Sequence, residues 1–347
     1  MESPSPGELF NSLSRVTALS STDAWAVGMQ ISAPGDLFTI NTLAEHWDGS
    51  AWSEVPTPTS FEGWLSGIHA LAANDIWAVG SVFEDPIESS PIVEHWDGAA
   101  WNVVPSPDIE LANLFDVAGT SSSDLWAVGT YRGRFPAMLI EHYDGTRWSR
   151  VSVPPISSDF IALSAVTAVS PTNVWSVGYY LGSDGRNKPL AVHYDGSSWR
   201  LVTVPSKGLG DEELNDVVAT NSGHVWVAGR GSDGAHFRTL ALHWTGHRFR
   251  IVRTPNLGMG DNGLSGMAAR SRGRMRAVGS WTDQTGMART LVLDYARGKW
   301  LRVSSPNASE EENSLASVAI SPQGDSWAVG GRDPHSVGKT LIEHVCG

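Results

Sequence analysis

Short apolar stretches alternate with polar turns along the whole chain. From residue 65 the sequence runs LSGIHALA, the polar turn AND, then IWAVGSVF, a loop, IVEHW, and, after an Asp-Gly pair, AAWNVVP. Short stretches rich in branched and aromatic side chains predict strands, and Asp-Gly predicts a tight turn between two of them. Helical spacing of apolar residues does not persist anywhere. The pattern predicts four short antiparallel strands in a unit of about 50 residues.

This unit is repeated. EHWDGSAW at 45–52 returns as EHWDGAAW at 94–101, EHYDGTRW at 141–148 and VHYDGSSW at 192–199, with weaker copies from 242, 293 and 343. A second motif, WAVG or a variant of it, accompanies each copy. Seven copies about 50 residues apart predict an all-β fold, a seven-bladed β-propeller with four antiparallel strands per blade. A single domain is expected over 1–347, with blades at approximately 9–58, 59–107, 108–155, 156–205, 206–255, 256–306 and 307–347 plus 1–8.

The two ends of the sequence are expected to share a blade. The last unit stops after its third strand, whereas MESPSP at 1–6 is similar to the end of a fourth strand, SEVPTP at 53–58. A ring whose last blade is completed by the N-terminal strand has no open sheet edge. We therefore predict that the N-terminal strand joins the last blade.

The repeat resembles those of the kelch superfamily and of the galactose oxidase propeller. Their repeats contain an aromatic-aliphatic-aliphatic-glycine strand, similar to IWAVG at 76–80, and a Tyr-Asp turn before Trp and Pro, similar to YDGSSWRLVTVP at 194–205. The double glycine of kelch strands is single in most copies here. The resemblance implies a seven-bladed propeller and little about activity, because binders and enzymes share that fold. The copper chemistry of galactose oxidase needs a cysteine cross-linked to a tyrosine, and Cys346 lies in no matching motif.

Composition limits the function further. The net charge of −13 argues against a nucleic-acid partner, which needs clustered Lys and Arg. A single cysteine excludes a disulfide framework and a cysteine-based zinc site. No apolar run approaches the roughly 20 residues of a membrane span. We expect a soluble, monomeric protein without a metal or cofactor. The start MESPSPGELF has no signal-peptide pattern, so the compartment is cytoplasmic or, with a leader removed, extracellular.

The repeated residues are interpreted as structural. The histidine of each EHWDG copy is expected to contact the residue that opens the second strand of its own blade, usually an aspartate. In the sixth unit the histidine becomes Asp294, and its expected partner is Arg274. Most of the 16 tryptophans occupy two positions of the repeat, where they are expected to fill the wedges between blades. The glycine of WAVG is expected to allow a close backbone approach or a bulge.

Unlike residues on the innermost strands are the candidates for catalysis. Arg15, Asp116 and Asp216 share one column of the repeat, and His69 lies nearby on its own strand. A carboxylate pair with a histidine and an arginine at the channel suits acid–base chemistry. The alternative is a hydrated channel lining in which these side chains satisfy one another.

Unlike residues on the loops are the candidates for binding. Loops between second and third strands and between blades emerge on one face, and such loops often carry binding residues. Aromatic candidates for stacking on a sugar are Trp64, Tyr131, Tyr180 and Trp281. A cation precedes the third strand in four consecutive blades, as Lys188, Arg238, Arg289 and Lys339, and this arc could receive a carboxylate or phosphate. Alternatively, the rings pack the loops and the cations pair with the acidic loops at 211–213 and 310–312.

Two functions follow from these candidates. The first is a binding propeller that recognises a carbohydrate or peptide on the loop-rich face, at the mouth of the channel. The second is a propeller enzyme, a lyase, hydrolase or epimerase/cyclase, acting on a small polar substrate in the channel mouth. The sequence contains no nucleophile elbow, phosphate-binding glycine loop, zinc-type histidine pair or calcium loop.

Overall fold

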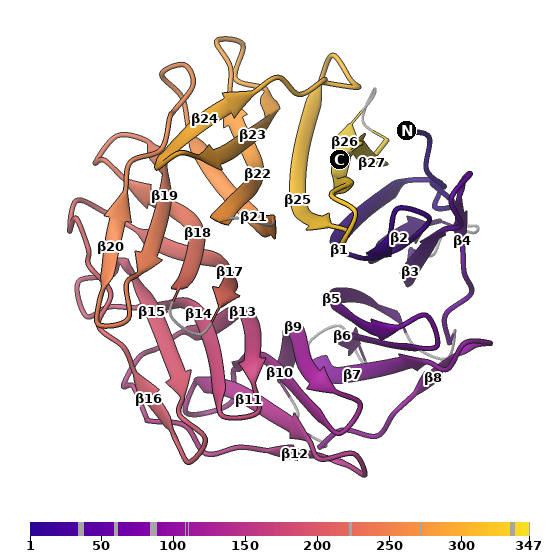
Figure 1. The fold of residues 1–347 in the computed structure, drawn as a ribbon, viewed down its shortest axis with the longest axis horizontal. Coiled ribbons are helices and arrows are strands. Elements are labelled where there is room, and N and C mark those ends of the chain that lie inside the picture. Colours follow the sequence, from indigo (N-terminus) through magenta and orange to yellow (C-terminus); the bar gives the residue numbers. More distant parts are fainter. Residues whose placement is uncertain are drawn as a thin grey trace.

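The chain forms a ring of seven small β-sheets around a central axis (Figure 1). The computed structural model describes residues 1–33, 38–58, 62–83, 89–107, 109, 111–221, 224–270, 273–333 and 337–346. Within these residues every regular element is a strand and there is no α-helix. Six sheets have four antiparallel strands and the seventh has three, each in chain order. The predicted seven-bladed, all-β propeller is confirmed.

The strands of the first four blades follow the repeat. Blade 1 comprises β1 (Phe10–Ser20), β2 (Asp23–Ser32), β3 (Thr39–Trp47) and β4 (Trp52–Glu54). Blade 2 comprises β5 (Glu62–Ala72), β6 (Asp75–Phe83), β7 (Ser89–Trp96) and β8 (Trp101–Val103). Blade 3 comprises β9 (Ala112–Ser121), β10 (Asp124–Tyr131), β11 (Ala137–Tyr143) and β12 (Trp148–Arg150). Blade 4 comprises β13 (Ile161–Ser170), β14 (Asn173–Leu181), β15 (Asn187–Tyr194) and β16 (Trp199–Leu201).

The remaining three blades continue the same order. Blade 5 comprises β17 (Glu212–Asn221), β18 (His224–Ser232), β19 (Phe237–Trp244) and β20 (Phe249–Val252). Blade 6 comprises β21 (Asn262–Arg270), β22 (Arg274–Thr282), β23 (Ala288–Ala296) and β24 (Lys299–Val303). Blade 7 comprises β25 (Glu312–Ile320), β26 (Ser326–Asp333) and β27 (Lys339–Val345). The first strand of each blade faces the centre, and the fourth lies at the rim (Figure 1).

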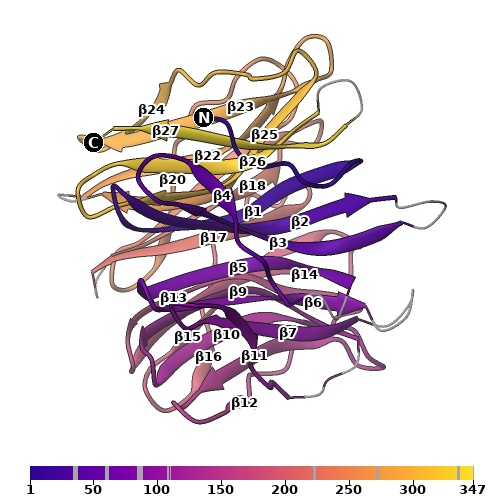
Figure 2. The same ribbon diagram turned by 90° about the vertical axis from the view of Figure 1, so that its right-hand side faces the viewer.

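The N-terminal segment lies against the last blade, beside β27 (Figures 1 and 2). The hydroxyls of Ser5 and Thr340 are 2.9 Å apart, and Thr340 also donates to the carbonyl of Pro4 at 2.7 Å. The same pair of hydroxyls, at 2.6–2.8 Å, joins the third strand to the tail of the fourth in blades 1, 5 and 6, as Thr42–Thr57, Thr239–Thr254 and Thr290–Ser305. Residues 1–5 therefore take the place of a fourth strand and close the ring, although they form no regular ladder.

A bulge in every innermost strand explains the glycine of the WAVG motif. In blade 1 the register between β1 and β2 shifts between Leu13 and Arg15, and the other six blades shift at the same place. A Cβ on Gly28 would lie 1.9 Å from the carbonyl oxygen of Ser12, and the six equivalent glycines meet a carbonyl at 1.8–2.1 Å. Only glycine permits that approach, so the expected close backbone contact is confirmed.

Tryptophans fill the spaces between blades, as expected. Each hydrophobic cluster of the core combines two neighbouring blades; one contains Trp126 of blade 3 and Trp199 of blade 4, whose rings meet edge to face at 5.4 Å. Trp25 and Trp101 make the same contact between blades 1 and 2, at 5.8 Å. Because these rings bury large areas in the wedges, the core is a ring of interfaces and not one central cluster.

The repeated histidine belongs to a network inside each blade. His46 Nε2 lies 3.0 Å from Asp23 Oδ1, the Trp25 indole donates to the same oxygen at 3.2 Å, and the Trp25 ring stacks on the imidazole at 4.2 Å. The same three-membered contact recurs in blades 2, 3 and 4, with Asn173 replacing aspartate in blade 4. The structural interpretation of the histidine column is thus supported by direct contacts.

In the sixth blade the expected pair of Asp294 with Arg274 is wrong. Asp294 does not pair with Arg274, which is exposed; it pairs with Arg276, which occupies the tryptophan position of the motif. Arg276 Nε and Nη2 donate to the two carboxylate oxygens at 2.8 and 2.9 Å, and Nη1 donates to Ser326 of blade 7 at 2.6 Å. Residues 274 and 276 share one face of the strand. The sequence pattern therefore identified the charge exchange but assigned it to the wrong arginine.

Candidate functional site

The four catalytic candidates meet at the central channel. Arg15 of blade 1 makes a two-pronged ion pair with Asp116 of blade 3, with Nε–Oδ1 and Nη2–Oδ2 distances of 3.1 and 2.6 Å. Its remaining Nη1 lies 3.1 Å from Asp216 Oδ1 of blade 5. His69 of blade 2 lines the same cavity. The structure therefore brings all four candidates to one cavity.

The two aspartates also hold the next blades. Asp116 Oδ2 accepts the backbone N–H of Val166 in blade 4 at 2.9 Å. Asp216 Oδ2 accepts that of Met267 in blade 6 at 2.7 Å, and its Oδ1 accepts the N–H of Val217. One arginine thereby ties five blades together through two carboxylates. We call Arg15, Asp116 and Asp216 the channel clasp.

The electrostatics of the clasp are those of a closed set of charges. Burial alone would lower the pKa of the Arg15 guanidinium, but the charges of Asp116 and Asp216 outweigh it and raise that pKa above its usual range. Burial raises the pKa of the Asp216 carboxyl, against the opposing effect of Arg15. Both aspartates are almost fully buried, and their oxygens already accept hydrogen bonds. This arrangement matches a mutually satisfied lining.

His69 stands apart from the clasp. Burial lowers the pKa of its imidazole. Its Nε2 is buried and has no hydrogen-bond partner within the described part of the chain. A general base works on a proton within hydrogen-bond reach, and the carboxylates that would orient this ring are committed to Arg15.

The cavity that these residues line does not open toward the loop-rich face. Its volume is about 320 Å³, and its lining runs from the clasp toward the ends of the innermost strands, for example from Arg15 to Thr17 in β1 and from Ser317 to Ile320 in β25. Innermost strands start at the loop-rich face and end at the tight turns that lead into the second strands. This cavity therefore lies in the half of the channel opposite the loop-rich mouth, where the pocket was expected.

The arc of loop cations is largely occupied by ion pairs. Lys188 Nζ lies 2.7 Å from Asp184, Arg238 Nε 2.6 Å from Asp233, and Arg289 Nε 2.7 Å from Asp283. Each aspartate comes from the same loop as its cation, and not from the acidic loops at 211–213 and 310–312. Arg289 also donates to the backbone carbonyls of Glu310 and Glu311. Lys339, the fourth cation, starts β27 opposite Arg332.

The four aromatic candidates pack against the protein. Tyr131, Tyr180 and Trp281 each contact a hydrophobic cluster between blades. Trp64 lies edge to face on Phe83, with 4.8 Å between ring centroids. These contacts agree with the alternative interpretation, in which the rings stabilise the loops.

One large cavity among the described residues was not revealed by the sequence. It is a groove of about 1050 Å³ on the loop-rich face between blades 3 and 4, formed by 134–138, 150–159 and 181–183. Phe135 is 76% exposed there, and the Arg134 guanidinium lies 5.4 Å from its ring centroid. Arg150 lies 5.4 Å from the Tyr131 ring. Within the described chain neither arginine forms an ion pair, unlike Lys188, Arg238 and Arg289.

The groove lies where blade 3 lacks a hydrogen bond that four other blades make. Where blades 1, 5, 6 and 7 pair two hydroxyls between the third strand and the fourth-strand tail, blade 3 has Met138 and Val153. These side chains cannot make that bond, and Val153-Pro154 takes the place of the Ser/Thr-Pro of blades 1, 2, 5 and 6. Both residues line the groove. The signal was present in the sequence as a local departure from the repeat.

A second feature missed from the sequence lies in blade 7. Asp325, His344 and Cys346 each offer a metal-ligand atom, and these atoms all lie within 4.8 Å of one another. Cys346 was expected to take part in no site; pairing of β26 with β27 brings it and His344 next to Asp325, which lies before β26.

Comparisons with known proteins show the fold and no family. No protein-family model matches the chain, and no curated protein matches it. Among solved structures it is similar to the extracellular domain of a hybrid two-component system from B. thetaiotaomicron, with a TM-score of 0.60 and 8% identity over 98% of this chain. The chain spans 39% of that protein.

Two further structures share the architecture. An ulvan lyase, a polysaccharide lyase solved with the saccharide GlcA(1-4)Rha3S, gives a TM-score of 0.59 at 9% identity, covering 97% of this chain and 94% of its own. A fucose-recognising lectin from Aleuria aurantia, a six-bladed propeller, gives 0.51 at 11% identity, covering 87% of this chain and 100% of its own. At these identities the likeness establishes the β-propeller architecture alone, and membership of the kelch family is not shown. Among the described residues there is no helix long and apolar enough to cross a membrane.

Proposed function

We propose that this protein is a binding propeller that recognises an acidic carbohydrate in the groove between blades 3 and 4. The observation that carries the proposal is the exposed Phe135 ring, which lines the groove together with Arg134 and Arg150, two arginines that form no ion pair within the described chain. An aromatic face suits stacking on a sugar ring, and a guanidinium binds a carboxylate or sulfate with two parallel hydrogen bonds. The volume of the groove corresponds to that of a ligand site for several linked sugars.

This proposal keeps the loop-rich face but moves the site from the channel mouth to the rim. It also disfavours the enzyme alternative, because acid–base chemistry needs a group that is free to exchange protons. Asp116 and Asp216 both hold Arg15 and backbone amides instead. Of the similar structures described above, one is a fucose-recognising lectin and one is a lyase bound to a saccharide, and so the fold is compatible with either class.

An array of neutral and acidic oligosaccharides, with peptides as a second panel, tests the proposal. We expect binding to acidic oligosaccharides, reduced at least about tenfold, or ~1.4 kcal/mol, by Phe135→Ala and by Arg150→Ala. Arg200→Ala is the matched control, since Arg200 is an exposed arginine on the fourth strand of the neighbouring blade and pairs with Asp195. Binding only to peptides, or equal binding by all three variants, would contradict the proposal.

A further inference from the structure

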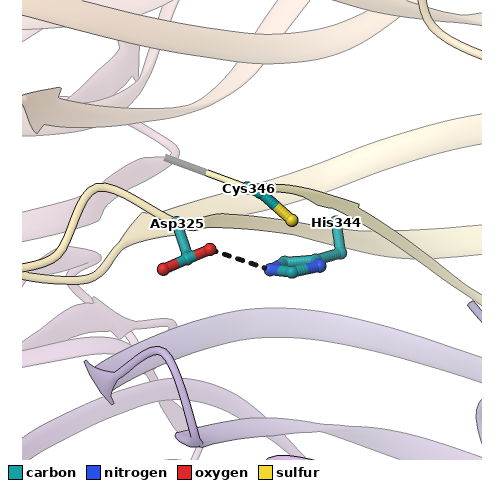
Figure 3. Close-up of side chains that lie close together, drawn as sticks. All are labelled: Asp325, His344 and Cys346. Carbon is teal, nitrogen blue, oxygen red and sulfur yellow. Dashed lines mark ion pairs between the residues drawn. The ribbon is translucent and has the colours of Figure 1, made fainter.

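Blade 7 brings three different metal-binding side chains together at the end of its last two strands. Asp325 lies at the turn before β26, His344 near the end of β27, and Cys346 directly after it (Figure 3). Figure 3 shows the three side chains close together, with a dashed line for the ion pair between Asp325 and His344. Their ligand atoms all lie within 4.8 Å of one another, and the His344 Nε2–Asp325 Oδ1 distance is 3.5 Å.

The usual histidine network is opened in this blade. In blades 1 to 3 the histidine lies 2.8–3.0 Å from its aspartate, and a tryptophan donates to the same oxygen. In blade 7 the contact is longer, and the Trp327 indole finds no hydrogen-bond partner in the described chain. His344 Nε2 is likewise buried without a hydrogen bond among the described residues. The imidazole nitrogen that faces Asp325 is therefore available as a ligand.

Cys346 replaces a residue that is fully used elsewhere. In blade 1 its position is held by Asp48, whose carboxylate accepts the backbone N–H groups of Ser50 and Ala51 in its own tight turn. Asp97 and Asp144 do the same in blades 2 and 3. Cys346 is the only cysteine and its side chain is exposed. A thiol thus takes the place of a turn-capping carboxylate beside an imidazole and a second carboxylate.

We propose that Asp325, His344 and Cys346 form a zinc site. Thiolate, imidazole and carboxylate are all established zinc ligands, and three protein ligands leave a fourth position for water or an external group. At tetrahedral angles and usual bond lengths, ligand atoms lie about 3.3–3.8 Å apart, so closure around Zn²⁺ needs a shift of about 1 Å. The thiolate favours zinc over magnesium or calcium, which prefer oxygen ligands.

A bound metal would add a link within blade 7, the blade that closes the ring. Asp325 is fixed by its turn, where its carbonyl accepts the N–H of Ser321 at 2.8 Å. β27 is the outer strand of a three-stranded sheet, and residues 1–5 lie against its edge. A metal that joins the end of β27 to the turn before β26 stabilises the closing blade.

Titration of the reduced, tag-free protein with Co²⁺, followed by competition with Zn²⁺, tests this site. We expect one ion per chain, a near-ultraviolet thiolate-to-cobalt band that zinc abolishes, and a melting temperature that rises with zinc concentration. Cys346→Ser should remove the band and weaken zinc binding about 100-fold or more, above the 10–100-fold cost of losing an outer partner. Because Cys346 is exposed, this variant is expected to fold normally.

Two histidine variants complete the test. His344→Asn should weaken zinc binding as Cys346→Ser does. His46→Asn is the matched control, since blade 1 has the same histidine and aspartate but no thiol, and it should bind zinc like the parent protein. Unaltered zinc affinity in Cys346→Ser, a cobalt complex without the thiolate band, or equal losses in the two histidine variants would overturn the proposal.

Discussion

Arg276 and Asp294 form a two-pronged ion pair at the two positions where every other blade places a tryptophan and a histidine. Arg276 is only 5% exposed, so its charge depends on this partner. Removing one member of a buried pair leaves an uncompensated charge, which costs about 3–5 kcal/mol. Asp294 is partly exposed, and we therefore expect Asp294→Ala to lower the free energy of unfolding by about 3 kcal/mol, measured in urea.

The control for this ion pair introduces the tryptophan and histidine that other blades have at these positions. The double variant Arg276→Trp with Asp294→His restores the side chains of blade 1 and should recover most of the lost stability. If Asp294→Ala is as stable as the parent protein, the ion pair does not hold blade 6 together.

The channel clasp is predicted to be structural. Arg15→Met leaves Asp116 and Asp216 buried without their shared cation, at a cost of about 3–5 kcal/mol in urea unfolding. Adding Asp116→Asn and Asp216→Asn removes the two uncompensated charges, and this triple variant should be more stable than Arg15→Met alone. Equal stability of Arg15→Met and the parent protein would show that the clasp does not carry the ring.

Glu94 makes stability depend on pH. It is fully buried, and burial raises the pKa of its carboxyl from 4.5 to about 8. Between these values the unfolded chain ionises Glu94 while the folded chain keeps it protonated, so the free energy of unfolding falls as pH rises, and levels off above about pH 8. Each unit of pKa shift corresponds to about 1.4 kcal/mol.

The equivalent residues of other blades suggest a substitution that tests the pKa shift of Glu94. Blades 4, 5 and 6 hold Val192, Leu242 and Leu293 at this position. Glu94→Leu should therefore stabilise the protein more at pH 8 than at pH 4.5, by an amount on the order of 1–4 kcal/mol. Glu62→Gln, on an exposed side chain, serves as the control and should leave the pH profile unchanged. Parallel profiles for Glu94→Leu and the parent protein would contradict the shift.

Closure of the ring by residues 1–5 predicts a stability loss on truncation. Deleting residues 1–8 removes the Ser5–Thr340 and Pro4–Thr340 hydrogen bonds and uncovers the edge of β27. We expect the melting temperature to fall by several degrees, since about 1 kcal/mol corresponds to roughly 2–4 °C in domains of a few hundred residues. Ser5→Ala should show a smaller part of the loss and Ser53→Ala, on an exposed side chain, none. An unchanged melting curve after truncation would rule out this closure.

The fold could be predicted because its causes recur in every blade. The glycine of WAVG, the tryptophan wedges and the histidine–aspartate contact each leave a fixed residue type at a fixed spacing. The channel clasp was also within reach, because unlike charges occupied one column of otherwise small residues. What could not be read was the partner of each charge. Asp184 and Lys188, for instance, meet across a hairpin whose geometry sequence alone does not give.

The two sites found only in the structure depend on what is missing from a blade. Met138 and Val153 line the groove at positions where four other blades pair two hydroxyls, and Cys346 of the zinc-type cluster replaces an aspartate that caps a turn. Each substitution looks minor until strand register shows what the usual residue contacts. Departures from a repeat are therefore most informative once the contacts of the repeated residue are known.

Hydrogen–deuterium exchange with a bound acidic oligosaccharide tests the central claim most directly, because it locates the ligand without a variant. The account predicts slower exchange at 134–138 and 150–159, which form the groove, and no change at 15–17, 116–118 and 216–218, which line the channel. Protection of the channel segments with an unprotected groove would contradict it and return the site to Arg15, Asp116 and Asp216.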